Sequence, residues 1–216
     1  MTVDEFVDEL SSVSLPNVFN PYRDICALSD HSNSPFLRQQ NLSFFLDSVL
    51  NEPRRSIWLG RDLGYRGGRR TGIALTDEYH LEAFKRTFGV CGVVKATLDE
   101  EPVKERTATE VWKLLRKVKE PIFLWNVFPF HPYDEGDPFS NRRHTTHEFE
   151  VCRHMLVMLL EWLEPTTIIA LGADAESALL SIGYECKRVR HPSYGGQNDF
   201  ARQICEIYDL EARNLC

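Results

Sequence analysis

The sequence predicts an α/β fold, a three-layer α/β/α sandwich with a central, mostly parallel four-stranded sheet. Three short apolar runs of strand length, followed by a fourth that is more polar, lie at residues 56–59, 122–125, 167–171 and 186–189. Segments with apolar side chains at three- and four-residue spacing separate these runs, as expected of amphipathic helices. Strands that alternate with helices in this way pair in parallel and are covered by helices on both faces.

The first 55 residues are expected to form a helical part in front of the sheet. Apolar residues at helical spacing predict a helix over residues 1–14, and Pro16 and Pro21 frame a loop after it. Ser34 begins a second helix, which ends near Pro53. The run that follows is the first predicted strand.

The other predicted helices lie between or after the strands. Thr107 or Thr109 is expected to cap one of them, and Pro165 is expected to close the longest. The wholly apolar run 122–125 is typical of a central parallel strand that is covered on both faces. The predicted helices span residues 77–88, 108–119, 145–163, 173–181 and 198–208.

Size and charge limit the class of protein. With 216 residues and 43% hydrophobic content, the chain can bury a substantial core. We expect a single domain over residues 1–216, in which residues 56–200 form the core that carries the motifs. The net charge of −7 argues against a protein that holds nucleic acid by bulk charge. Local arginine clusters are still compatible with an enzyme that has a basic face.

Cysteine usage and hydropathy narrow the class further. The six cysteines are scattered singly with no Cys-x-x-Cys pair, so we expect neither a metal site nor another cofactor. No apolar run approaches the ~20 residues that span a membrane, and no N-terminal segment resembles a signal peptide. These features predict a cytoplasmic protein that acts as a monomer without a membrane partner.

The most distinctive stretch follows the first predicted strand. Residues 60–72 contain five glycines, four arginines and one acid, Asp62. Glycines let the backbone approach a ligand closely, and arginines favour an anion, so the pattern predicts a flexible cationic loop. Asp62 is either a functional carboxylate or a salt-bridge partner of Arg61 or Arg66.

Other polar residues are expected to lie near this loop. In open parallel sheets the ligand crevice lies outside the carboxyl ends of the strands. Asp62 follows the first strand, and Asn126 and His131 follow the second. His191 follows the fourth strand. We therefore expect these side chains to converge on one edge of the sheet.

Four sequence blocks, taken in order, resemble the motifs of the uracil-DNA glycosylase superfamily. The first is a glycine and an acid in a loop after a strand, and the second is a strand that ends in asparagine. The third runs from an Asn-Arg turn to a Leu-Gly before a helix, and the fourth is a His-Pro-Ser triplet. They are residues 60–76, 124–127, 141–152 with 165–175, and 191–193, so the resemblance spans residues 56–200.

The resemblance implies a DNA glycosylase that acts on a base flipped out of DNA. Asp62 is the implied catalytic carboxylate, which stabilises positive charge on the sugar and orients or deprotonates water. His191 is implied to donate a hydrogen bond to the pyrimidine O2 as the base leaves. Asn126 is implied to read the Watson-Crick edge with its amide.

DNA is therefore the expected partner, and several polar side chains are candidates to contact its backbone. Ser193 is implied to touch a phosphate near the flipped nucleotide, whereas Arg142 and Arg143 are equally compatible with a solvated surface. Tyr194 is the candidate for the wedge that fills the gap in the duplex. The expected DNA-binding residues are Arg61, Arg66, Arg69, Arg70, Arg142, Arg143, Ser193 and Tyr194.

Two departures from the uracil-specific branch concern the base pocket. Gly64 stands where that branch has a tyrosine that closes the pocket against a substituent at the pyrimidine 5-position. Leu75 stands where that branch has the aromatic residue that stacks on the base, so a wider and less tightly stacked pocket is expected. His131 is either structural or part of the pocket. The expected substrate-binding residues are Asn126, Gly64, Tyr65, Leu75 and His131.

These implications lead to a monofunctional DNA glycosylase whose base is a pyrimidine with a 5-substituent. Such an enzyme would serve repair, or defence against phage DNA that carries modified bases. One alternative is a uracil or mismatched-thymine glycosylase in base excision repair. Two others are a non-catalytic module that binds damaged or modified DNA and a small-molecule nucleotide binder of similar architecture. The branches with an iron-sulfur cluster need four cysteines, and only Cys152 sits where one of them would be.

Overall fold

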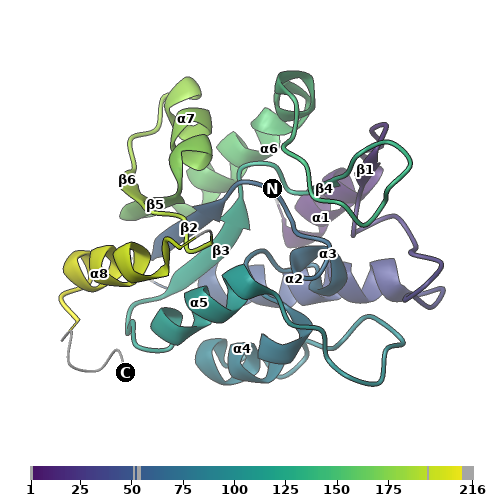
Figure 1. The fold of residues 1–216 in the computed structure, drawn as a ribbon, viewed down its shortest axis with the longest axis horizontal. Helices are drawn as coiled ribbons and strands as arrows, with labels where there is room; N and C mark the ends of the chain where they lie inside the picture. The colour runs from purple at the N-terminus through teal and green to yellow at the C-terminus, as the bar shows by residue number, and fades with distance from the viewer. Residues whose placement is uncertain (1, 51, 53–54, 194, 211–216) are drawn as a thin grey trace.

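Four parallel strands form the centre of the molecule, as predicted (Figure 1). The computed structural model describes residues 2–50, 52, 55–193 and 195–210. The strands lie in the order β3-β2-β5-β6, and every neighbouring pair is parallel. Their bounds are Ser56–Gly60 for β2, Ile122–Asn126 for β3, Thr167–Leu171 for β5 and Lys187–Val189 for β6. The polar fourth strand is thus an edge strand, which explains its two exposed residues.

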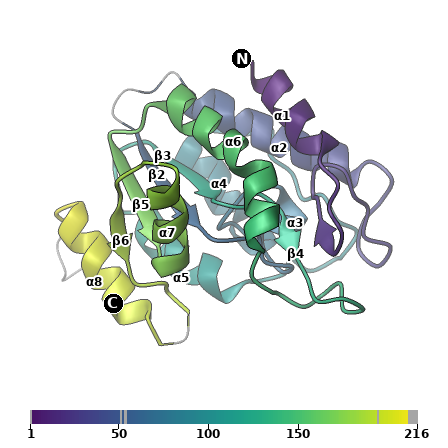
Figure 2. The same ribbon diagram turned by 90° about the horizontal axis from the view of Figure 1, so that it is seen from above.

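Helices cover both faces of this sheet, which confirms the predicted three-layer architecture. On one face lie α6 (Thr146–Leu163) and α7 (Ala173–Ser181), and Figure 2 shows them side by side. On the other face lie α4 (Leu81–Phe88), α5 (Arg106–Leu115) and α8 (Gln197–Ile207) (Figure 1). Trp58 of β2 packs against Phe200 and Tyr208 at the α8 side, with ring centroids 6.3 and 5.9 Å apart.

The N-terminal helices pack onto the β3 side of the same core. A capping box between Thr2 and Glu5 begins α1 (Val3–Ser12). Its Phe6 lies 5.9 Å from Trp125 of β3, measured between ring centroids. In α2 (Ser34–Leu50), Phe45 lies 4.6 Å from Phe123 of the same strand. These aromatic contacts join the helical part to the sheet in one hydrophobic core.

Two short elements near the motifs were not predicted. Strand β1 (Val18–Phe19) pairs antiparallel with β4 (His131–Pro132). Each has two residues, which is too short to leave an alternating pattern in the sequence. The pairing fastens the segment after α1 to the segment that follows β3. The expectation of a plain loop between the two prolines is therefore corrected.

The predicted flexible glycine-arginine loop is ordered instead. It contains a single helical turn, α3 (Gly68–Thr71), whose C-cap Gly72 has a left-handed backbone with φ 75°. The hydroxyl of Tyr22 donates a 2.9 Å hydrogen bond to the Gly72 carbonyl, and the amide of Asn41 donates one of 2.8 Å to the Thr71 carbonyl. These bonds hold the turn against residues of the N-terminal part.

Two predicted helices have different starts. The segment expected to be one helix over 77–88 begins as a 3-10 turn, η1 (Glu78–His80), capped by the Asp77 carboxylate. Helix α5 begins after Glu105, so neither predicted threonine is its N-cap. The Thr109 hydroxyl instead donates to the Glu105 carbonyl at 2.9 Å. The Glu105 carboxyl makes no capping hydrogen bond.

Gly72 and Gly89 offer a matched pair for measuring how tightly α3 is held. Both have positive φ, but a Cβ at Gly72 would lie 2.7 Å from the Arg38 carbonyl oxygen, whereas one at Gly89 would meet nothing within 4 Å. Left-handed backbone alone costs a non-glycine residue about 1–2 kcal/mol. We expect Gly89→Ala to lower the free energy of unfolding by about that amount and Gly72→Ala by about 3 kcal/mol or more. Urea titration measures both, and equal losses would contradict the tight contact.

Candidate active site

A cavity of about 440 Å³ opens at the carboxyl ends of the parallel strands. It brings together Asp62 after β2, Asn126 at the end of β3 and His191 after β6. Gly64 and Leu75, the two departures noted in the sequence, also line it. Its other polar walls include Arg61, Glu105, Thr107, Asn141, Asp174 and Arg190.

The backbone fixes the loop that carries Asp62. Beyond the last paired residues of β2 and β3, the two chains continue side by side through hydrogen bonds. Val127 N–H donates to the Gly60 carbonyl and Phe128 N–H to the Arg61 carbonyl, each at 3.0 Å. Leu63 N–H donates back to the Phe130 carbonyl at 3.1 Å. Asp62 is therefore held between two backbone anchors.

Two basic side chains hold the Asp62 carboxylate, whose exposed fraction is 5%. Arg61 Nε contacts Oδ2, and His144 Nδ1 contacts Oδ1. The His144 ring packs near Phe128 and Phe149, with centroids 5.2 and 5.8 Å away. A buried carboxylate is stable only when it is paired and hydrogen-bonded, and here both oxygens are. Of the sequence alternatives, Arg61 is thus a direct partner of Asp62.

The pairing continues across the cavity wall. Arg61 Nη1 donates to Oδ2 of Asp174 at 2.9 Å, and Arg143 Nη2 donates to Oδ1 of the same residue at 2.5 Å. Asp174 lies in the first turn of α7. This network ties the loop after β2 to the helix after β5, so the orientation of Asp62 depends on both.

Asn126 lines the cavity, and its amide oxygen has no hydrogen-bond partner among the described residues. Asn126 is 1% exposed, and no donor among the described residues reaches its buried Oδ1. A Cβ at Gly60 would overlap that oxygen, so glycine at this position leaves the amide its place. Leaving a buried acceptor without a partner costs free energy, and such atoms in native proteins call for an explanation. A hydrogen-bond donor on a bound ligand would satisfy it.

Leu75 lies beside this amide in an unusual conformation. Its φ of 55° is left-handed, which is uncommon for a branched residue. Its residue is 7% exposed, and its Cδ2 would lie 3.1 Å from a Cβ at Gly60. Strained backbone of this kind concentrates at functional sites, where the surrounding structure enforces it.

His191 lines the cavity, and its contacts leave Nε2 as a hydrogen-bond donor. Burial, followed by the charges of Arg61 and Arg190, lowers the pKa of His191 to about 4. Its Nδ1 accepts from the Ser193 backbone N–H at 3.2 Å and lies 2.6 Å from the Ser193 hydroxyl. A backbone N–H can only donate, so the proton of the neutral ring is on Nε2. Ser193 therefore orients His191 here, and its hydroxyl oxygen still has lone pairs for another donor.

His131 and Tyr65 do not line the cavity. His131 is 0% exposed, and burial followed by the charge of Arg69 lowers its pKa to about 4. Its Nδ1 accepts from Arg69 at 3.1 Å, so its Nε2 donates to the Ser140 carbonyl at 2.8 Å. His131 thus makes internal hydrogen bonds and is not among the residues that line the cavity. The Tyr65 ring packs edge-on against Phe139, with ring centroids 6.1 Å apart.

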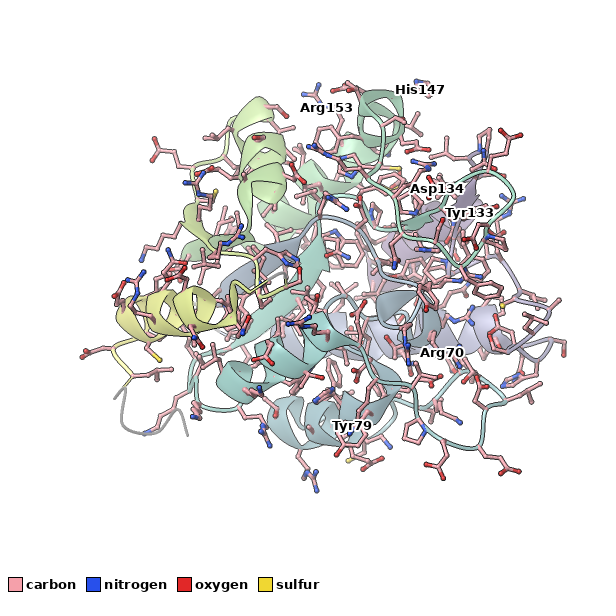
Figure 3. All side chains as sticks on the ribbon, in the orientation of Figure 1. Arg70, Tyr79, Tyr133, Asp134, His147 and Arg153 are labelled. Atoms are coloured by element: carbon pink, nitrogen blue, oxygen red, sulfur yellow. The ribbon has the colours of Figure 1, made fainter. Side chains whose placement is uncertain are left out.

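Two of the arginines expected to contact DNA turn inward. Arg69 is 5% exposed, lies 3.9 Å over the Phe19 ring and donates to the Pro138 carbonyl. Arg70, labelled in Figure 3, extends from α3 and pairs with Glu78 at 3.1 Å and with Asp99. These contacts leave neither guanidinium free for a phosphate, so the expectation is corrected for both.

The remaining arginines divide into anchors and surface groups. Arg142 forms a bidentate pair with Glu148, at 2.6 and 2.9 Å, and Glu148 belongs to the capping box that begins α6. Arg66 is exposed and makes no ion pair with another described residue. Arg143 is 63% exposed beside Asp174. Arg190, which sequence reasoning missed, is exposed at the cavity wall, and Tyr194 lies outside the described residues.

Sequence reasoning also missed His144, Asp174 and Glu105. His144 directly precedes Thr145, the N-cap residue of α6, so the capping box of that helix fixes the backbone next to His144. Glu105 precedes α5, and burial followed by the charge of Asp77 raises its pKa to about 7, with a partial offset from Arg66. A raised carboxyl pKa in a cavity is typical of a functional group.

The described part of the chain contains no group of three or more His, Cys, Asp or Glu side chains placed to hold a metal ion. No described helix has both the length and the apolar character needed to cross a bilayer.

The fold and this cavity define the class of protein. A parallel α/β sandwich carries a buried carboxylate, an amide and a neutral imidazole at the carboxyl ends of its strands. Residues 48–209, most of the chain, match the model of the Uracil DNA glycosylase superfamily. The chain belongs to this superfamily of DNA glycosylases.

Among solved structures, the chain is similar to the crystal structure of wild-type Pedobacter heparinus SMUG2. The TM-score is 0.65 at 15% sequence identity, and the match covers 96% of this chain and 97% of that chain. At this identity the likeness concerns the fold. Among proteins with curated descriptions, none matches the chain in sequence.

The protonation of His191 is open to direct measurement. Because its pKa is lowered to about 4, the imidazole should stay neutral, with the proton on Nε2, from pH 8 down to pH 5.5. Nitrogen-15 NMR of histidine-labelled protein reports the tautomer at each pH. Free histidine in the same buffer, which titrates near pH 6.5, is the reference. A midpoint near 6.5 for His191, or an Nδ1-protonated ring, would contradict the assignment.

The Glu105 carboxyl should make stability depend on pH. Its pKa rises from 4.5 in the unfolded chain to about 7 in the folded one, so folding is penalised once the solution pH exceeds these values. Glu105→Gln should therefore be more stable than wild type by about 2 kcal/mol at pH 8.5, a value reduced for the partial exposure of the residue. The difference should nearly vanish at pH 4, below the pKa of the unfolded chain. Glu101→Gln, at an exposed position, is the control. A stability difference that does not depend on pH would contradict the raised pKa of Glu105.

Proposed function

We propose that the protein is a monofunctional DNA glycosylase that hydrolyses the N-glycosidic bond of a flipped, 5-substituted pyrimidine. The observation that supports this best is the set of groups in one cavity: the Asp62 carboxylate, the unpaired Asn126 oxygen and the His191 N–H donor. Each matches one requirement of the reaction. The product is an abasic site and a free base.

The leaving base needs stabilisation of negative charge. As the bond breaks, electron density moves onto the pyrimidine ring and its O2. A neutral imidazole that keeps Nε2–H pointed at O2 stabilises this charge without transferring the proton. The lowered pKa of His191, about 4, favours this electrostatic role over that of a general acid.

The sugar needs stabilisation of positive charge. Asp62 is the carboxylate available to stabilise the oxocarbenium-like centre and to orient or deprotonate the attacking water. Arg61 and His144 fix both of its oxygens, so its direction is set before substrate arrives. Preorganisation of this kind avoids reorganisation at the moment of reaction.

The base is recognised by Asn126 and by the space around it. The unpaired Oδ1 needs a donor, which the N3–H of a uracil-type base or the 4-amino group of a cytosine-type base supplies. Gly64 adds no side chain of its own to the wall, where the Glu105 carboxyl lies against it, and Leu75 offers an aliphatic contact to the ring. These features support a pyrimidine that carries a group on C5.

DNA is the proposed partner, and a base in a duplex must be flipped to reach the cavity. Arg66, Arg143 and Arg190 are the exposed cations on this side that are suited to phosphate contacts. The pathway is either repair or defence against phage DNA with modified bases.

An abasic-site assay tests the proposal. DNA containing uracil, thymine opposite guanine, or hydroxymethylated or glucosylated cytosine is incubated with the protein and then cleaved with alkali. We expect wild type to leave abasic sites, and Asp62→Asn and His191→Ala to react at least ~100-fold more slowly. Lys113→Ala, on the exposed face of α5, is the control that should match wild type. Thermal unfolding of each variant shows that it is folded.

The other outcomes identify the alternatives. If wild type cleaves none of these DNAs, or if both variants cleave as fast as wild type, the proposed mechanism is wrong. Cleavage of uracil or mismatched thymine alone would place the protein among repair enzymes for those bases. Binding without cleavage, with affinity that falls steeply as salt increases, would indicate a module that only recognises DNA.

A further inference from the structure

The Glu105 side chain lines the cavity and does not cap its helix. Glu105 occupies the N-cap position of α5, and its carboxyl accepts no backbone N–H there. Its backbone N–H is fixed by a 2.6 Å hydrogen bond to Oδ2 of Asp77. The side chain extends instead to the glycine loop after β2, and Glu105 lines the cavity.

Two glycines make room for this carboxyl. A Cβ at Gly64 would overlap Oε1 of Glu105, and a Cβ at Gly67 would overlap Oε2 and lie 2.7 Å from Cδ. Gly64 has no positive φ, so its φ does not require glycine at this position. The absence of a side chain at Gly64 therefore leaves the space that the carboxyl fills. Asn141 Oδ1 would lie 3.9 Å from the Gly64 Cβ, so an amide borders the same space.

The carboxyl has no protein partner among the described residues. No hydrogen bond or ion pair reaches either of its oxygens, although Arg66 and Asp77 both influence it electrostatically. Burial, followed by the charge of Asp77, raises its pKa to about 7, and Arg66 offsets part of this rise. A carboxyl in this state donates through its proton below that pH and accepts above it. It is therefore suited to a hydroxyl, which does both.

Ring geometry indicates which part of a base would meet it. In a pyrimidine, C2 and C5 lie opposite each other across the ring. With O2 at His191 on the β6 side and the N3–C4 edge at Asn126, the 5-substituent points away from His191. Gly64, Glu105 and Thr107 line the same cavity and are the residues we assign to the wall that this substituent faces.

We propose that Glu105 determines specificity by hydrogen-bonding a hydroxyl carried on C5 of the flipped pyrimidine, as in a 5-hydroxymethyl base. This inference rests on the proposed glycosylase function and names its substrate class. A 5-methyl group in the same place would leave the carboxyl buried against carbon without a partner. Sites built to pair with a substrate hydroxyl reject the analogue that lacks it for this reason.

Matched bases and a double-mutant cycle test the role of Glu105. Cleavage rates are measured for uracil, thymine and 5-hydroxymethyluracil, and for cytosine, 5-methylcytosine and 5-hydroxymethylcytosine, in identical DNA. Wild type should cleave a hydroxymethyl base at least tenfold faster than its methyl analogue. Glu105→Ala should remove that preference, so that the hydroxymethyl base and its methyl analogue are cleaved at similar rates. Glu105→Gln, which still donates and accepts, should retain part of it.

Gly64→Ala supplies an independent variant whose Cβ displaces the carboxyl without changing it. Because the overlapping atom is the end of a flexible side chain, the protein should fold. Gly64→Ala should reproduce the loss seen in Glu105→Ala, and adding it to Glu105→Ala should have little further effect. Additive losses would show that the glycine acts through something other than the carboxyl.

Failure of this inference is separable from failure of the proposed function. If wild type cleaves uracil but no hydroxymethyl base, or if Glu105→Ala slows every base equally, Glu105 does not select the substituent and the glycosylase proposal stands. An unchanged preference in Glu105→Ala has the same meaning. If wild type cleaves no base at all, both proposals are overturned.

Discussion

The burial of one carboxylate organises the site. Asp62 lies almost without solvent, and an unpaired charge there would cost several kcal/mol. Arg61 and His144 supply the compensation, and each is in turn held by others. Arg61 reaches Asp174 on α7, and His144 lies among aromatic rings just before α6. Loops from three parts of the chain must therefore be in place together before the carboxylate can be buried.

Much of the fold could be predicted because it follows from patterns longer than a few residues. The runs that became β2, β3 and β5 were apolar and bounded by glycine, asparagine or proline, and the helices between them had clear periodicity. What escaped prediction is short. Strands β1 and β4 have two residues each and α3 has four, and such elements exist only because the surrounding structure pairs or caps them.

The site divides in a similar way. Asp62, Asn126 and His191 could be placed in one region because strand order fixes where loops meet. Glu105 and His144 could not, because their roles depend on side-chain contacts between distant segments. The arginines of the glycine loop were misjudged for a related reason. Composition indicates a cationic surface. In the structure, however, Arg69 packs over the Phe19 ring and hydrogen-bonds His131, and Arg70 forms an ion pair with Glu78.

The inward arginines also affect how long the protein would stay on DNA. With Arg69, Arg70 and Arg142 engaged inside the molecule, the phosphate contacts that we propose fall to the exposed Arg66, Arg143 and Arg190. Each phosphate contact adds about 0.9 to the slope of log affinity against log salt, so three give a slope of about −3. Such a slope corresponds to weak electrostatic binding of DNA by a protein whose net charge is −7. With so few phosphate contacts, the proposed enzyme would dissociate quickly from most positions on DNA. Its specificity would then depend on the few side chains that contact the flipped base.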